Sequence, residues 1–214
     1  MEQKKKRILM SIVGVIVSGI SVGFFKRAMF GVDPFQSFMS GLDAMVPISF
    51  GTLYVIANIC LLLFSILNDR SKIGIATGIN LFFTGYIADY SHQLMNQIFP
   101  ELGLPGRFVM LILGIVVMCF ASAFYFAADM GVSTYDAVAL VISEKWNPAS
   151  FRVCRICCDL VCVIIGVLLF LCAGEPLSDI GAVVGVGTII TAFFMGPLIT
   201  FFHEHAAQPF LNAK

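Results

Sequence analysis

The sequence predicts an all-α membrane protein with six transmembrane helices, arranged as two inverted three-helix repeats that each carry a short re-entrant or interfacial helix. Only 12% of the 214 residues are charged, about half the share of an ordinary soluble domain. Four uncharged stretches are 18 to 23 residues long, and roughly 18 apolar residues suffice to suggest a membrane span. A motif also recurs one hundred residues later. This composition argues against a soluble enzyme.

The first span is predicted over residues 8–25, directly after the basic run from Lys4 to Arg7. A signal peptide would begin in the same way. Residues 31–34 make a poor cleavage site, however, and further spans follow, so we expect a retained helix. The predicted span at residues 151–172 is weaker, because it contains charges, including Arg155 and Asp159. The remaining spans are predicted at residues 46–68, 73–88 (ended by Asp89), 108–128, 151–172 and 180–202.

The positions of lysine and arginine residues indicate the orientation. With the N-terminus in the cytoplasm, ten of these residues lie on the inner side, down to Lys214, and only Lys26, Arg27 and Arg107 lie outside. This asymmetry satisfies the positive-inside rule. Six spans then return the C-terminus to the cytoplasm. The 13 basic and 13 acidic residues balance, so the net charge gives no indication of a nucleic-acid partner.

The recurring motif indicates a duplicated chain. Residues 31–36 read GVDPFQ and residues 131–136 read GVSTYD. Each opens an apolar segment, 33–45 or 133–143, that is too short to cross the bilayer and is typical of a re-entrant or interfacial helix. We also expect the Gly74-x3-Gly78 pattern to correspond to Gly181-x3-Gly185, which sets Gly187 opposite Asn80.

The duplication divides a single polytopic domain, residues 1–214, into repeat 1 (8–92) and repeat 2 (107–202). Each repeat holds three spans. Because three is an odd number, the second copy enters the membrane from the opposite side, and the repeats are therefore expected to be inverted. Inverted repeats with interrupted helices are a recurring plan of secondary transporters, which bind their solute near the midplane.

The motif has the residue types that break and restart a helix. Pro34 suits the first helical position, and Asp33 before it is a good N-cap. Ser133 or Thr134 takes that part in the second copy. Gly31 and Gly131 allow a sharp turn ahead of each short helix.

Polar residues at membrane depth are the candidates for a substrate site. Helix N-termini favour an anion, but acids in both motifs can satisfy those N–H groups, which leaves a site for cations or for a cycling proton. Bland alternatives stay open: capped surface helices, a structural Arg155–Asp159 ion pair one helical turn apart, and interhelical contacts of Asn80. The candidate substrate-binding residues are Asp136, Asp33, Asn58, Asp159, Asn80 and Arg155.

Signals for catalysis are weak. Residues 19–23 read GISVG, a nucleophile-elbow pattern, but no histidine is expected near Ser21. Cys154, Cys158 and Cys162 lie on one helical stripe, and ligands from one continuous helix do not readily close a tetrahedral metal site. We expect no enzymatic activity, no cofactor and no metal.

The duplicated Gly-Val-x-x-aromatic signature resembles the YczE/YyaS/YitT group of bacterial integral membrane proteins, nearest the YczE-like branch, over nearly the whole chain. That branch is expected to carry a Gly-x-x-Pro-Trp-Asp motif and a later Gly-x-x-Pro-x-Asp motif. Gly31, Pro34, Gly131 and Asp136 match, whereas Phe35-Gln36 replaces Trp-Asp and Thr134 replaces proline. The resemblance implies a multi-pass protein of the bacterial cytoplasmic membrane and a transporter-like function, without a substrate.

Two functions follow as hypotheses. The first is a small secondary transporter or facilitator of a small polar or ionic solute. The second is a noncatalytic partner or scaffold that assists another membrane system. The expected partners are the lipid bilayer and an unknown small solute, not nucleic acid, and the glycine-rich faces would suit a homodimer.

Overall fold

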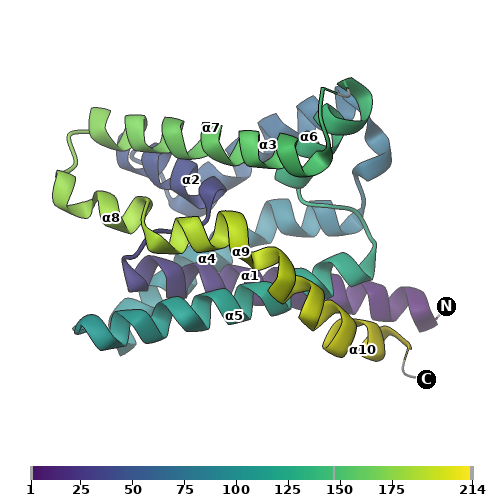
Figure 1. Ribbon diagram of the computed structural model, residues 1–214, viewed down its shortest axis with the longest axis horizontal. Helices are drawn as coiled ribbons and strands as arrows, with labels where there is room; N and C mark the ends of the chain where they lie inside the picture. Colours follow the sequence, from purple (N-terminus) through teal and green to yellow (C-terminus); the bar gives the residue numbers. More distant parts are fainter. Residues whose placement is uncertain (1, 147, 213–214) are drawn as a thin grey trace.

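The fold is a bundle of helices, seen in a computed structural model that describes residues 2–146 and 148–212 (Figure 1). Lys214, counted above among the inner cations, lies outside the described residues. Short 3₁₀ or π-helical turns lie at residues 70–72, 142–146, 177–179 and 203–207. The α-helices are α1 (Glu2–Ala28), α2 (Pro34–Met45), α3 (Phe50–Asn68), α4 (Ile75–Ile98), α5 (Leu104–Ala128), α6 (Thr134–Val141), α7 (Phe151–Cys172), α8 (Ile180–Val183), α9 (Val186–Phe202) and α10 (Gln208–Asn212).

Five helical segments of the described chain are long and apolar enough to cross a membrane. The span predicted at residues 73–88 corresponds to α4, which is not one of these five segments. Its helix also runs nine residues past Asp89, where the sequence predicted an end. The side chain of Asp89 is half-buried and accepts a hydrogen bond from the side chain of Gln93, one turn later in the same helix. The five segments are Gln3–Ala28, Phe50–Asn68, Leu104–Ala128, Phe151–Cys172 and Leu177–Asn212.

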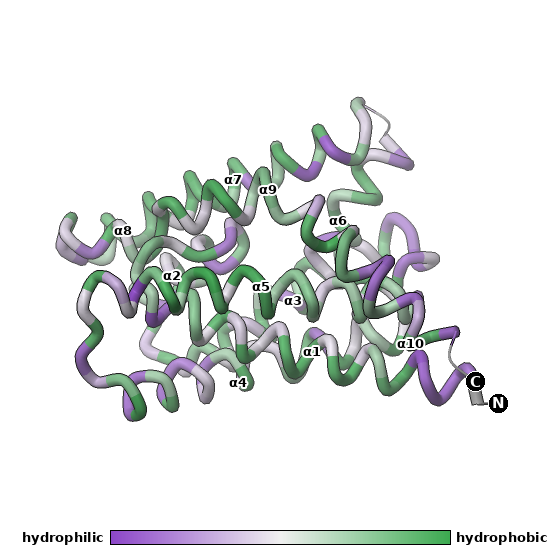
Figure 2. Tube along the Cα trace, turned by 60° about the horizontal axis from the view of Figure 1, so that its bottom comes forward, coloured by the Kyte–Doolittle hydropathy of each residue, from purple (hydrophilic) through white to green (hydrophobic). Residues whose placement is uncertain are grey.

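The helices form two groups that face each other. α1 lies between α4 and α5, and α2 packs along α7, while α3 contacts α4 and α6 (Figure 1). α9 packs on α5 and reaches α2. The start of α1 and the short α10 lie at the same end of the molecule, and hydrophobic residues dominate the length of the helices (Figure 2).

Both short helices begin where the motif predicts. The carboxylate of Asp33 accepts a hydrogen bond from the Gln36 N–H at 3.1 Å, and Pro34 occupies the first turn of α2. The hydroxyl of Ser133 accepts one from the Asp136 N–H at 3.0 Å at the start of α6. The predicted N-caps are therefore confirmed.

The turn before each short helix is fixed by contacts with the other half of the chain. Gly31 (φ +89°) and Gly131 (φ +107°) adopt the left-handed conformation that glycine favours. A Cβ on Gly131 would lie 2.7 Å from the Cα of Gly74, so a larger residue does not fit. The Thr77 hydroxyl donates to the Val132 carbonyl at 2.6 Å, and across the molecule the Gly187 N–H donates to the Phe30 carbonyl at 2.7 Å.

One predicted correspondence between the halves is wrong by one helical turn. Gly74 and Gly185 are the N-caps of α4 and α9, and the hydroxyls of Thr77 and Thr188 accept from their N–H groups at 3.1 and 3.2 Å. Gly185, not Gly181, thus has the N-cap position and the threonine contact that Gly74 has. The reason is the extra turn of α8, which the glycine spacing alone does not reveal. With this shift of four residues, Thr191, and not Gly187, occupies the position in the second half that corresponds to Asn80.

Candidate functional site

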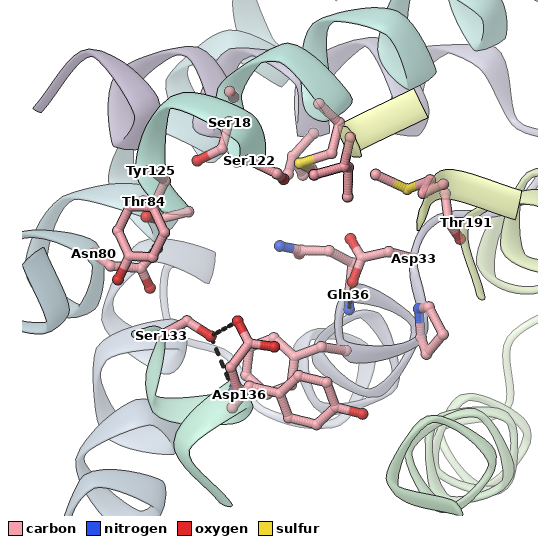
Figure 3. A pocket seen from close by; sticks show the side chains of 18 of the residues that line it. Ser18, Asp33, Gln36, Asn80, Thr84, Ser122, Tyr125, Ser133, Asp136 and Thr191 are labelled. Atoms are coloured by element: carbon pink, nitrogen blue, oxygen red, sulfur yellow. Dashed lines mark hydrogen bonds between the residues drawn. The ribbon is translucent and has the colours of Figure 1, made fainter. Parts of the chain in front are cut away.

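The structure brings all six candidate residues to one cavity of about 410 Å³. This volume lies in the range of small-molecule sites, roughly 300 to 1,000 Å³. The cavity lies between the two halves, with Asp33 and Gln36 at the start of α2 facing Ser133 and Asp136 at the start of α6 (Figure 3). The candidates that line it are Asp33, Asn58, Asn80, Asp136, Arg155 and Asp159.

Aromatic rings join the two short helices at the cavity wall. The rings of Phe35 and Tyr135, which occupy the same motif position, stack with centroids 5.0 Å apart and planes 26° apart. Tyr54 of α3 packs its ring edge against Phe35 at 5.7 Å. Such pairs stabilise by about 0.5–1.5 kcal/mol beyond their buried area. The stack holds the N-terminal ends of α2 and α6 close together.

Arg155 is the cation of a partly buried ion-pair network. Its guanidinium pairs with the carboxylate of Asp136, and its Nε lies 3.2 Å from Oδ1 of Asp159. The Tyr135 hydroxyl donates to the same Asp159 oxygen at 2.7 Å, and the Tyr135 ring lies 4.4 Å from the guanidinium carbon. The Arg155–Asp159 ion pair, which the sequence left open as an alternative to a transport role, is present. Arg152, three residues before Arg155, is exposed at the start of α7.

Asn58 has its hydrogen-bonding groups satisfied within the protein. Its side chain is 1% exposed, its Nδ2 donates to the Tyr54 carbonyl at 2.8 Å, and its Oδ1 accepts from the hydroxyl of Thr134. Thr134 is itself buried at the first turn of α6. Asn58 therefore links α3 to α6. The only support for a role of Asn58 in solute binding is that it lines the cavity.

Other polar groups at the cavity lack partners. Among the described residues, Oε1 of Gln36, Oδ1 of Asn80 and the hydroxyl of Tyr125 are buried without a hydrogen bond. Buried polar atoms are normally paired, and each exception needs an explanation. The hydroxyl of Thr84, which also lines the cavity, lacks a partner as well. Four exceptions around one cavity indicate a place where water or a solute completes the hydrogen bonding.

The sequence did not point to several wall residues. Tyr125 lies in a run of aromatics on α5, and Tyr54 and Thr84 look like ordinary span residues until the fold places them beside the cavity. The available signal for Tyr135 was the aromatic shared by both motifs. Gln36 was noted only as a departure from a family motif, yet its side chain points into the cavity (Figure 3).

The long apolar helices of the described chain define a multi-pass membrane protein. The chain belongs to DUF6198, a family of unknown function, whose model matches residues 5–204. The resemblance to the YczE and YyaS proteins is confirmed by this family match and by the relatives that match the chain.

Three relatives match most of the chain. The uncharacterized membrane protein YczE of Bacillus subtilis is 25% identical over 190 residues, which cover 87% of this chain and 80% of its own. The uncharacterized protein YyaS of the same organism is 21% identical over 201 residues, 94% of each chain. An uncharacterized protein of Haemophilus influenzae is 21% identical over 92% of this chain and 83% of its own. No solved structure matches.

Proposed function

We propose that this protein is a small secondary transporter or facilitator that carries a small polar or ionic solute across the bacterial cytoplasmic membrane. The observation that carries this proposal is the cavity of about 410 Å³ between the two halves, whose wall includes the first residues of both short helices. Solute sites formed by interrupted helices near the membrane midplane are a general feature of secondary transporters. The proposal requires no catalytic residue, cofactor or metal.

The proposal includes two inverted repeats and six spans, which are the five candidate segments and α4. Its 24 residues extend about 36 Å at 1.5 Å per residue, enough for a hydrocarbon core of roughly 30 Å. The repeat is supported by the matching turns at Gly31 and Gly131, the caps at Asp33 and Ser133, and the Gly-x-x-Thr starts of α4 and α9.

We also propose that both termini lie in the cytoplasm. The start of α1 and α10 lie at one end of the molecule, and the lysines that precede the first span favour the inner side. Labelling of single cysteines placed at Lys5 and at Asn212, in a background without native cysteines, is expected to require permeabilised cells at both positions. Labelling of either site in intact cells would contradict this orientation. A homodimer stays a prediction.

A thermal-stability screen tests the transporter proposal. The purified protein in detergent is expected to be stabilised by at least one member of a panel of ions, amino acids, nucleosides and metabolites, and the shift is expected to shrink in Asp136→Asn. A solute at one hundred times its Kd stabilises by about 2.7 kcal/mol. Asp129→Asn is the matched control, because the Asp129 side chain is 86% exposed and does not line the cavity.

The screen also separates the two hypotheses. If no member of the panel stabilises the wild-type protein, the transporter proposal is contradicted. Purification from native membranes with one stoichiometric protein partner would then favour the noncatalytic scaffold.

A further inference from the structure

We propose that the solute is a small organic cation whose charged group binds Asp33. This inference rests on the proposed function and names the substrate class of the same cavity. It follows from the charge balance of the wall, from the capping of both helix ends and from buried polar side chains that lack partners.

The cavity wall has an excess of negative charge. Among the described residues that line it, the charged ones are three carboxylates, Asp33, Asp136 and Asp159, and one guanidinium, that of Arg155. Arg155 is already paired with Asp136 and Asp159. With these groups ionised, the wall carries a net charge of −2, and the carboxylate of Asp33 is the one that Arg155 does not contact as an ion pair. A cationic solute would balance this charge.

The N-termini of α2 and α6 do not offer a site for an anion, because groups of the protein already cap them. The N–H of Gln36 donates to the Asp33 carboxylate, and the N–H of Ser37 donates to the Asp33 carbonyl at 2.8 Å. At α6 the Asp136 N–H is capped by Ser133, whose hydroxyl also donates to the Asp136 carboxylate at 2.6 Å. Both partial positive charges are thus met by an acid of the protein, which leaves little attraction for an anionic solute.

Unpartnered side chains independently indicate a ligand. Gln36 is only 4% exposed, its Oε1 has no partner, and its side chain extends into the cavity next to Asp33 (Figure 3). Tyr125 is 7% exposed, and its hydroxyl has no partner either. A carboxylate, an amide and a phenol together provide acceptors for the N–H donors of an ammonium or guanidinium group.

The rest of the wall suits carbon rather than a bare ion. Val22, Met118 and Met195 line the cavity along with the stacked rings of Phe35 and Tyr135. Apolar side chains with a few placed polar groups are typical of sites for organic molecules, and aromatic faces attract cations. A cavity of about 410 Å³ also exceeds the size of a single inorganic ion.

Four probes of equal chain length test the charge preference: butane-1,4-diamine, 4-aminobutyrate, butane-1,4-diol and succinate. The diamine is expected to raise the melting temperature of the wild-type protein in a concentration-dependent manner, with succinate and the diol without effect. In Asp33→Asn the apparent Kd of the diamine is expected to rise at least tenfold. Asparagine is as good an N-cap as aspartate, so this variant removes the charge and keeps the start of α2.

Asp43→Asn is the matched control, because Asp43 lies on the same helix, is exposed and does not line the cavity. Its diamine response is expected to equal that of the wild type. Stabilisation by succinate or the diol in place of the diamine would overturn the cation assignment and leave the transporter proposal standing. Undiminished diamine binding in Asp33→Asn would likewise overturn the assignment to Asp33. Silence of all four probes and of the broader panel would contradict both proposals.

Discussion

Arg155→Gln is expected to destabilise the protein strongly. The substitution removes the cation that Asp136 and Asp159 share, and leaves two largely buried carboxylates close together without a counter-ion. Loss of one partner of a buried ion pair costs roughly 3 to 5 kcal/mol. We expect the lower end, about 3 kcal/mol, since the Arg155 side chain is 33% exposed and partly hydrated. Thermal unfolding of the purified variant in detergent measures the effect.

Two further variants make this result specific. Arg155→Gln combined with Asp159→Asn removes one cation and one carboxylate together, and is expected to recover part of the lost stability. Arg152→Gln, at an exposed position of the same helix, is expected to change the stability by less than about 0.5 kcal/mol. An Arg155→Gln protein as stable as the wild type would contradict a stabilising role of the Arg155 ion pairs.

Gly166→Ala is expected to separate α2 from α7 and to impair solute binding. A Cβ on Gly166 would lie 2.6 Å from the carbonyl carbon of Ser37 and 2.8 Å from the Phe38 N, and these are backbone atoms that cannot rotate away. Overpacking of this kind costs about 1–3 kcal/mol. Because Asp33 caps α2 and Gln36 lies on its first turn, a displacement of α2 shifts both relative to the rest of the cavity wall.

Gly78→Ala provides the matched comparison with the opposite sign. A Cβ on Gly78 meets no atom within 4 Å, so only the helix propensity changes, and alanine in a helix is favoured over glycine by about 1 kcal/mol. Melting temperatures of the two variants are expected to shift in opposite directions. A Gly166→Ala protein that melts at or above the wild-type temperature would contradict the close packing of α2 on α7.

Local chemistry explains why much of the fold was predictable. Uncharged stretches fix where a chain can cross a bilayer, and the Asp33-Pro34 pair fixes a helix start through the N–H groups near it. The six candidate residues share one cavity because polar side chains in apolar helices turn toward each other, away from lipid. Their grouping was therefore predictable from their types, although their role in binding stays a prediction.

The remaining features depend on contacts between distant segments. The correspondence of Gly74 with Gly185 depends on the turn of α8, which has no counterpart before α4. Tyr125 became a wall residue only through the packing of α5 beside α1. Neither periodicity nor composition contains these relations.

The bond between the Gly187 N–H and the Phe30 carbonyl has a consequence for synthesis of the chain on the ribosome. These residues are 157 positions apart, so at roughly 5–20 residues per second the second follows the first by about 8 to 30 seconds. For most of that interval α2 has no α7 to pack against, and α9 is made last. After the first half has been inserted into the membrane, Asp33 therefore lacks part of its final surroundings. The cavity wall is complete only once the last helices have been made and have packed.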